Sequence, residues 1–174
     1  MGNSKNHIFI IGMMGSGKSS IAQLLSTKYN IPYIDTDKDL VEIMGAEIQG
    51  IFKSLTKKKF YHLESTYFLE HIKGKQHIYA TGGGLVLNAA NRKALKKFGT
   101  TLFLNASINT LFNRLSADSK NIRPLFSNGL SKMQIKKIWE ERKKYYQQCS
   151  DIIIDANNKS VSTIVDEIIP LLKS

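Results

Sequence analysis

The chain has 174 residues, a length typical of one domain built around a single hydrophobic core. Its 25 Lys and Arg against 14 Asp and Glu give a formal net charge of +11, which favours anionic partners without choosing among phosphates, carboxylates and nucleic acid. The single cysteine, Cys149, excludes an intrachain disulfide and a multi-cysteine metal site, and it fits a reducing, cytoplasmic setting. The apolar stretch near the N-terminus is too short for a signal peptide or a membrane span, so we expect no membrane association.

Short apolar runs typical of strands alternate along the chain with segments of helical periodicity. The strand-like runs are 7–11, 32–35, 77–80, 100–104 and 151–155. The helical segments are 18–29, 37–53, 56–72, 88–97, 107–115, 131–147 and 160–173. This alternation predicts an α/β fold with a parallel sheet covered by helices on both faces. The irregular stretch 116–130 lies between two periodic helices, so we expect a mobile loop or lid there.

The lysines occur in short groups interleaved with apolar residues at helical spacing. These groups are 57–59, 96–97, 136–137 and 143–144. The pattern favours solvated helix faces over a stripe that binds nucleic acid, because no recognition element accompanies it. We therefore expect no nucleic-acid partner.

A phosphate-binding loop follows the first predicted strand. Residues 12–19, GMMGSGKS, match the pattern G-x-x-x-x-G-K-[ST] and open a helical segment. Glycines let such a loop wrap around a phosphate, and the helix that follows adds its positive end. Lys18 would contact the β- and γ-phosphates of a nucleoside triphosphate, and the Ser19 hydroxyl would bind Mg²⁺. The predicted nucleotide-binding residues of this loop are Gly12, Gly15, Ser16, Gly17, Lys18, Ser19 and Ser20.

Asp35 and Asp37 stand two residues apart at the end of the second predicted strand. If the strand runs to Asp37, both carboxylates point to the same side, at the edge of the sheet where ligands bind. One carboxylate would then hold Mg²⁺, and the other would accept the proton of an attacking hydroxyl. The alternative is that both only cap the next helix.

Three glycines, Gly82, Gly83 and Gly84, directly follow the third predicted strand. Without a Cβ, their backbone N–H groups can approach a polar substrate closely, so we expect them to contact the substrate. The alternative is a tight turn that needs positive φ.

Taken in order along nearly the whole chain, these motifs resemble the shikimate kinases, a family of the nucleoside monophosphate kinase-like P-loop group. The stretches that carry the resemblance are GMMGSGKSS (12–20), DTD (35–37), TGGG (81–84), IRPLF (122–126) and ERKKYY (141–146). The resemblance implies one P-loop kinase domain over 1–174, folded as a three-layer αβα sandwich with a short parallel sheet. It also implies an acceptor-binding segment at about 36–72, a lid at about 116–130, and transfer of phosphate from ATP to the 3-hydroxyl of shikimate.

The resemblance further implies roles for individual residues. Ser19 and Asp35 would hold Mg²⁺, and Asp37 would bind the shikimate hydroxyls and act as the base. Arg123 would reach from the lid toward the phosphates, and Arg142 would pair with the shikimate carboxylate. Positive charge and a planar guanidinium suit these tasks. The alternatives are an ordinary loop arginine at Arg123 and a solvated helix residue at Arg142.

The segment LTKKKFYHLE, 55–64, departs from the family. Phe60 and Glu64 match their family positions, but Tyr61 stands where the family has a second arginine for the shikimate carboxylate. Losing a charge-assisted hydrogen bond would weaken binding on the order of tenfold to a hundredfold. Lys58 or Lys57, three and four residues before Tyr61, could replace the missing cation. Tyr61 could instead shape the pocket for another acid.

Two alternative functions therefore stay open. The first is a P-loop kinase that phosphorylates another small hydroxylated acid, and the second is a catalytically weak ATP-binding regulatory paralogue. For the leading function, we expect a monomeric, cytoplasmic enzyme. It would use ATP and Mg²⁺ and act on a small-molecule substrate.

Overall fold

The computed structural model describes residues 7–45, 56–118, 126 and 129–173. A five-stranded parallel sheet in the order β2-β3-β1-β4-β5 forms its centre. The strands are β1 (His7–Gly12), β2 (Tyr33–Asp35), β3 (Ile78–Ala80), β4 (Gly99–Asn105) and β5 (Ile152–Asp155). Each predicted strand is present, because short apolar runs give a strong local signal.

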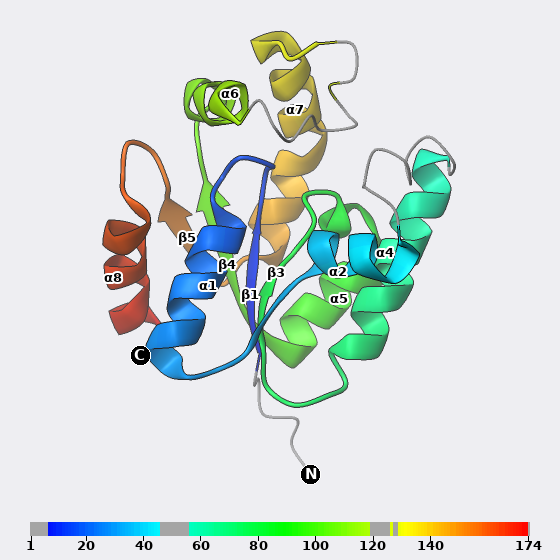
Figure 1. Ribbon diagram of the computed structural model, residues 1–174, viewed down its shortest axis with the longest axis vertical. Helices are drawn as coiled ribbons and strands as arrows, with labels where there is room; N and C mark the ends of the chain where they lie inside the picture. Colours follow the sequence, from blue (N-terminus) through cyan, green and yellow to red (C-terminus); the bar gives the residue numbers. More distant parts are fainter. Residues whose placement is uncertain (1–6, 46–55, 119–125, 127–128, 174) are drawn as a thin grey trace.

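Helices cover both faces of the sheet, as predicted (Figure 1). On one face, α1 (Lys18–Tyr29) packs against α8 (Val161–Leu171). On the other face, α5 (Ala89–Phe98) and α7 (Lys132–Cys149) contact β4, and α4 (Lys57–His71) lies beside α5. The remaining elements are α2 (Thr36–Met44), which contacts α4, α6 (Ile108–Ala117), which contacts α7, and the 3₁₀ turn η1 (Leu85–Leu87).

The hydrophobic core lies on both sides of β1, whose residues are all buried. Phe9 of β1 makes an edge contact with Phe68 of α4, and its ring also lies against that of Tyr79 in β3. Phe126 is buried in the same core, at 5 % exposure. The packing of helices on both faces leaves only the ends of the strands accessible for a binding site.

Local capping explains where the helices begin and end. Thr56 accepts a hydrogen bond from the Lys59 N–H and starts α4, as the sequence predicted for this stretch. α2 ends at Met44, because Gly45 adopts a left-handed conformation with φ 60°. The predicted helix over 37–53 was therefore too long at Met44, and its part beyond Gly45 lies outside the described residues.

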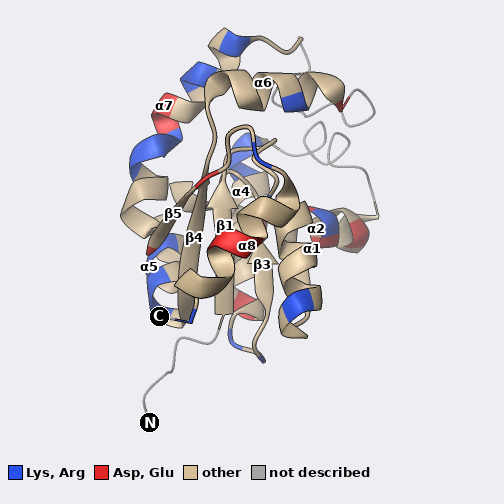
Figure 2. Ribbon diagram, turned by 90° about the vertical axis from the view of Figure 1, so that its left-hand side faces the viewer, with Lys and Arg blue, Asp and Glu red and all other residues tan. Residues whose placement is uncertain are grey.

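The lysine and arginine positions are spread over several helices rather than gathered along one stripe (Figure 2). The lysine groups at 57–59, 96–97, 136–137 and 143–144 are all exposed and all helical, as predicted. Within the described ranges, no helix combines the length and the apolar character needed to cross a membrane.

Candidate active site

The predicted motifs meet at the carboxyl edge of the sheet, the upper edge in Figure 1. The phosphate-binding loop follows β1, the aspartates follow β2 and the glycine run follows β3. Because β3 lies between β1 and β2, the three segments are neighbours. The topology therefore brings the sequence motifs into one site.

The phosphate-binding loop connects β1 to the N-terminus of α1. Gly17 is the N-cap of α1, at φ 99°, and it makes no side-chain capping hydrogen bond. The N–H groups at the N-terminus of α1 therefore stay available to a phosphate. The Lys18 Nζ donates to the carbonyls of Gly12 and Met13, at 3.0 and 2.9 Å. Ser16 is buried, and its hydroxyl has no partner among the described residues. Ser20 is exposed in the first turn of α1.

Ser19 and Asp35 form a pair of oxygen donors beside this loop. The Ser19 hydroxyl donates to Asp35 Oδ2 at 2.5 Å, while Asp35 Oδ1 accepts the Lys38 N–H at 3.3 Å and caps α2. Capping thus occupies one carboxylate oxygen and leaves the other facing Ser19. Oxygen donors of this kind fit Mg²⁺, which is usually held by one or two protein groups together with phosphates and water. Among the residues described, no cluster of three or more His, Cys, Asp or Glu could hold a metal by itself.

Asp37 reaches the site from a helix rather than from a strand. The second strand does not extend to Asp37, so the two aspartates do not lie on one strand. β2 ends at Asp35, and the capping interaction of Asp35 starts α2 at Thr36. A Cβ placed on Gly82 would lie 2.8 Å from Asp37 Oδ1. Asp37 therefore points at the glycine run, as its predicted role requires, although it gets there by helical geometry.

Glu64, on α4, is a site residue that our sequence analysis did not assign. It is only 1 % exposed, and a Cβ on Gly82 would overlap its Oε1. Burial and the nearby Asp37 carboxylate raise the pKa of Glu64 to about 8, against the opposing effects of Arg142 and Lys18. Its helical spacing was a usable signal, because Glu64 lies four residues from both Phe60 and Phe68 on the buried face of α4.

Arg142 lies in the buried stripe of α7 and is 1 % exposed, so the alternative of a solvated arginine is wrong. Its Nη2 donates to the Tyr61 hydroxyl at 3.0 Å. Its Nε is buried without a partner among the described residues. Tyr146, one turn further along α7, donates to the Gly83 carbonyl at 2.6 Å and ties the helix to the glycine run.

The glycine run is required by close approach rather than by positive φ, since none of its residues has one. A Cβ on Gly83 would lie 3.3 Å from Arg142 Nη1, and one on Gly84 would overlap the Tyr61 ring. The Gly82 N–H donates to the Thr36 hydroxyl at 2.8 Å and is already satisfied. The N–H groups of Gly83 and Gly84 have no protein partner within the described parts of the chain.

The remaining candidates differ in what the structure says of them. Arg123 and most of the predicted lid lie outside the described residues. Arg114, which the sequence analysis missed, donates from α6 to the carbonyls of Ser16 and Ala156, at 3.2 and 2.9 Å. It thereby joins α6, the phosphate-binding loop and the segment after β5. Its only sequence signal was its position on the helix that follows β4 at the same edge of the sheet.

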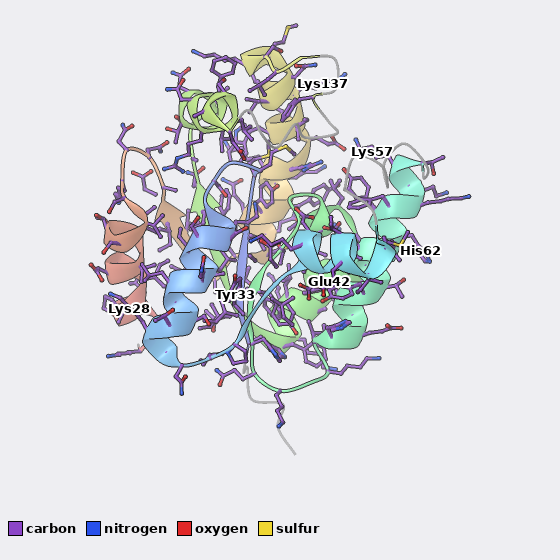
Figure 3. All side chains as sticks on the ribbon, in the orientation of Figure 1. Lys28, Tyr33, Glu42, Lys57, His62 and Lys137 are labelled. Atoms are coloured by element: carbon purple, nitrogen blue, oxygen red, sulfur yellow. The ribbon has the colours of Figure 1, made fainter. Side chains whose placement is uncertain are left out.

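The lysines considered as replacements for the missing arginine are not equivalent. Lys57, at the upper end of α4 in Figure 3, places its Nζ 5.8 Å from the centroid of the Tyr61 ring. Lys58 is exposed, and no hydrogen bond or cation–π contact between it and Tyr61 occurs among the described residues. His62 is exposed on the outer side of the same helix.

Comparison with known proteins agrees with this geometry. The family model "Shikimate kinase" matches residues 14–173. A curated shikimate kinase of Enterococcus faecalis is 36% identical over 166 residues, which cover 95% of this chain and 98% of that protein. The crystal structure of shikimate kinase from Aquifex aeolicus is 32% identical, with a TM-score of 0.78 over 96% of each chain.

A shikimate kinase from Acinetobacter baumannii in complex with shikimate superposes with a TM-score of 0.90 at 24% identity, covering 98% of this chain and 94% of that one, and it supports the fold. The predicted family, αβα fold and kinase class are therefore confirmed. The chain belongs to the shikimate kinase family of ATP-dependent kinases.

Proposed function

We propose that the chain phosphorylates the 3-hydroxyl of shikimate with ATP, using the site at the carboxyl edge of the sheet. The observation that carries this proposal is the arrangement around two adjacent glycines. Asp37 approaches Gly82, and Arg142 approaches Gly83. An acceptor that lies over these glycines would place a hydroxyl next to the Asp37 carboxylate. Its own carboxylate would lie next to the Arg142 guanidinium.

On the acceptor side, Asp37 would take the proton from the 3-hydroxyl as the hydroxyl oxygen attacks the γ-phosphorus of ATP. The bond from the γ-phosphorus to the bridging oxygen would break, and ADP would leave with that oxygen. Arg142 would hold the acceptor carboxylate by charge-assisted hydrogen bonds. The N–H groups of Gly83 and Gly84, which have no partner among the described residues, would add contacts to the acceptor. Together these groups fix one hydroxyl in line with the phosphate, which is the main requirement of phosphoryl transfer.

On the nucleotide side, the loop from Gly12 to Ser20 would bind the phosphates of ATP, with contributions from Gly15, Ser16 and Gly17. Lys18 would leave the carbonyls that it now contacts and stabilise charge on the transferred group. Ser19 and Asp35 would hold Mg²⁺, which neutralises phosphate charge when bound. Arg123 would supply further positive charge from the predicted lid, 116–130.

The test is a coupled assay of ADP release with and without shikimate. We expect ADP release to depend on shikimate, and we expect Lys18→Ala to abolish it, since this substitution removes the mobile phosphate-binding charge. Gluconate and quinate serve as comparison acceptors, because another hydroxylated acid was the alternative that Tyr61 left open. ADP release that shikimate does not stimulate would contradict the proposal.

The single-domain, monomeric and cytoplasmic character of the protein stays a prediction, as does the expectation that it binds neither nucleic acid nor membranes.

A further inference from the structure

Tyr61 stands where the family has a second arginine for the shikimate carboxylate. It lies against Arg142, the residue that this second arginine would have assisted. The Arg142 Nη2 and the Tyr61 hydroxyl are 3.0 Å apart, although the residues are 81 positions apart in sequence. The Tyr61 ring covers Gly84, whose missing Cβ leaves room for it. The side chain therefore belongs to the acceptor end of the site, where the N–H group of Gly84 is also unpaired within the described chain.

The direction of this hydrogen bond decides what Tyr61 can do. A guanidinium has only donors, so the phenol oxygen must accept from Arg142. The phenol hydrogen then remains, and no acceptor for it occurs among the described residues. Because burial is the largest effect and raises the pKa of Tyr61, the phenol keeps this hydrogen at neutral pH.

Arg142 also keeps donors that it does not use within the described chain. A guanidinium carries five N–H groups, and its Nε is buried here without a partner. Tyr146 fixes the neighbouring Gly83 carbonyl, so α7 and the glycine run hold their relative positions. Two donor groups, one charged and one neutral, are thus held side by side over the glycines.

We propose that Tyr61 and Arg142 together bind the carboxylate of the acceptor, with the Tyr61 hydroxyl donating the hydrogen bond that the missing arginine would have made. This inference rests on the proposed function and adds a specificity-determining residue to it. Arg142 and Tyr61 together bring less positive charge to the carboxylate than two arginines would. The neutral phenol also avoids the repulsion that a second guanidinium would exert on Arg142.

Lys57 is the competing candidate for this role. Its Nζ lies over the Tyr61 ring, 5.8 Å from the centroid, and the lysine is exposed. An ammonium held on the outer side of an aromatic ring supports the position of that ring by a cation–π contact. Lys57 therefore acts on Tyr61 from the solvent side, and Lys57→Ala should change acceptor binding less than Tyr61→Phe.

The test compares Tyr61→Phe with wild type in the shikimate-dependent assay. The substitution keeps the ring that packs on Gly84 and removes only the hydroxyl. We expect KM for shikimate to rise on the order of tenfold, while kcat and KM for ATP stay within about twofold. The preference for shikimate over its methyl ester should also narrow, because the lost hydrogen bond is stronger to a carboxylate than to an ester.

Tyr145→Phe is the matched control, since it removes a phenol hydroxyl from α7 at a residue that stacks with Arg92. Its kinetic constants should equal those of wild type. An unchanged KM for shikimate in Tyr61→Phe, an unchanged ester preference, or a larger effect of Lys57→Ala would each overturn the inference. Failure of the proposed function looks different, because wild type itself would then show no shikimate-dependent ADP release.

Discussion

Two carboxylates share the space beside Gly82, and their surroundings separate their roles. Burial and the nearby Asp37 carboxylate raise the pKa of Glu64 to about 8, so Glu64 holds its proton more tightly than an exposed glutamate does. Asp37 is half-buried in the first turn of α2, where a helix N-terminus favours negative charge. Burial therefore distinguishes the two carboxyl groups, and Asp37 is the one that faces the glycine run from a helix N-terminus.

At this residue scale, Asp37→Asn tests the base. We expect kcat to fall about 10²- to 10⁴-fold, the range usual for loss of a general base, with little change in KM for ATP. Asp39→Asn is the matched control on the same helix, because the Asp39 carboxylate accepts from the Tyr67 hydroxyl at 2.5 Å and faces α4 instead of the glycine run. Similar losses of kcat in both variants would remove the special role of Asp37.

The connection between β3 and η1 acts as a template for the acceptor site. Each of its three glycines lies against a different functional side chain, so each glycine limits where that side chain can lie. Gly82 and Gly84 have no room for a Cβ, since the Glu64 carboxylate and the Tyr61 ring fill it. Gly83 is more open, because its Cβ would meet Arg142 Nη1 at 3.3 Å, the end of a long side chain.

The role of the glycine run between β3 and η1 is tested by comparing two alanine variants. Gly83→Ala should raise KM for shikimate several-fold and leave KM for ATP nearly unchanged, because the added Cβ pushes Arg142 and covers the acceptor side of the run. Gly84→Ala should instead lower the midpoint of thermal unfolding, since the Tyr61 ring must move. A Gly83→Ala enzyme impaired mainly toward ATP would mean that the run serves as a turn beside the phosphate loop.

For the molecule as a whole, a buried acid links the active site to stability. The pKa of Glu64 is about 8 in the folded chain, against an ordinary value of 4.5. The folded state therefore holds this proton more tightly than the unfolded state does. The stability that it contributes is fully present below about pH 4.5 and is lost as the pH rises toward about 8.

Glu64→Gln should remove this pH dependence, because glutamine does not ionise. We expect the free energy of unfolding of the variant, relative to wild type, to increase steadily as the pH rises from about 4.5 to about 8. Denaturant unfolding at several pH values measures it, with Glu70→Gln, an exposed position on the same helix, as the control. A pH-independent difference between Glu64→Gln and wild type would contradict the buried, proton-binding role.

Most of the secondary structure could be predicted because its causes are local. The strands follow from apolar runs, and the phosphate-binding loop follows from eight consecutive residues. Capping was harder to predict, as α2 shows by starting at Thr36 and ending before Gly45. Those boundaries depend on single backbone conformations and on one side-chain hydrogen bond, which residue periodicity does not report.

The sequence by itself determined the αβα fold, the phosphate-binding loop and the identity of the aspartates, since each depends on neighbours in the chain. Only the tertiary structure decided that Glu64 lies beside Asp37 and that Tyr61 lies in hydrogen-bonding distance of Arg142. These contacts join α4, α2 and α7 across the glycine run, and their geometry is set by how the helices pack on the sheet. The sequence showed that an arginine was missing, and the positions of α4 and α7, which both contact η1 beside the glycine run, placed a phenol hydroxyl within hydrogen-bonding distance of Arg142.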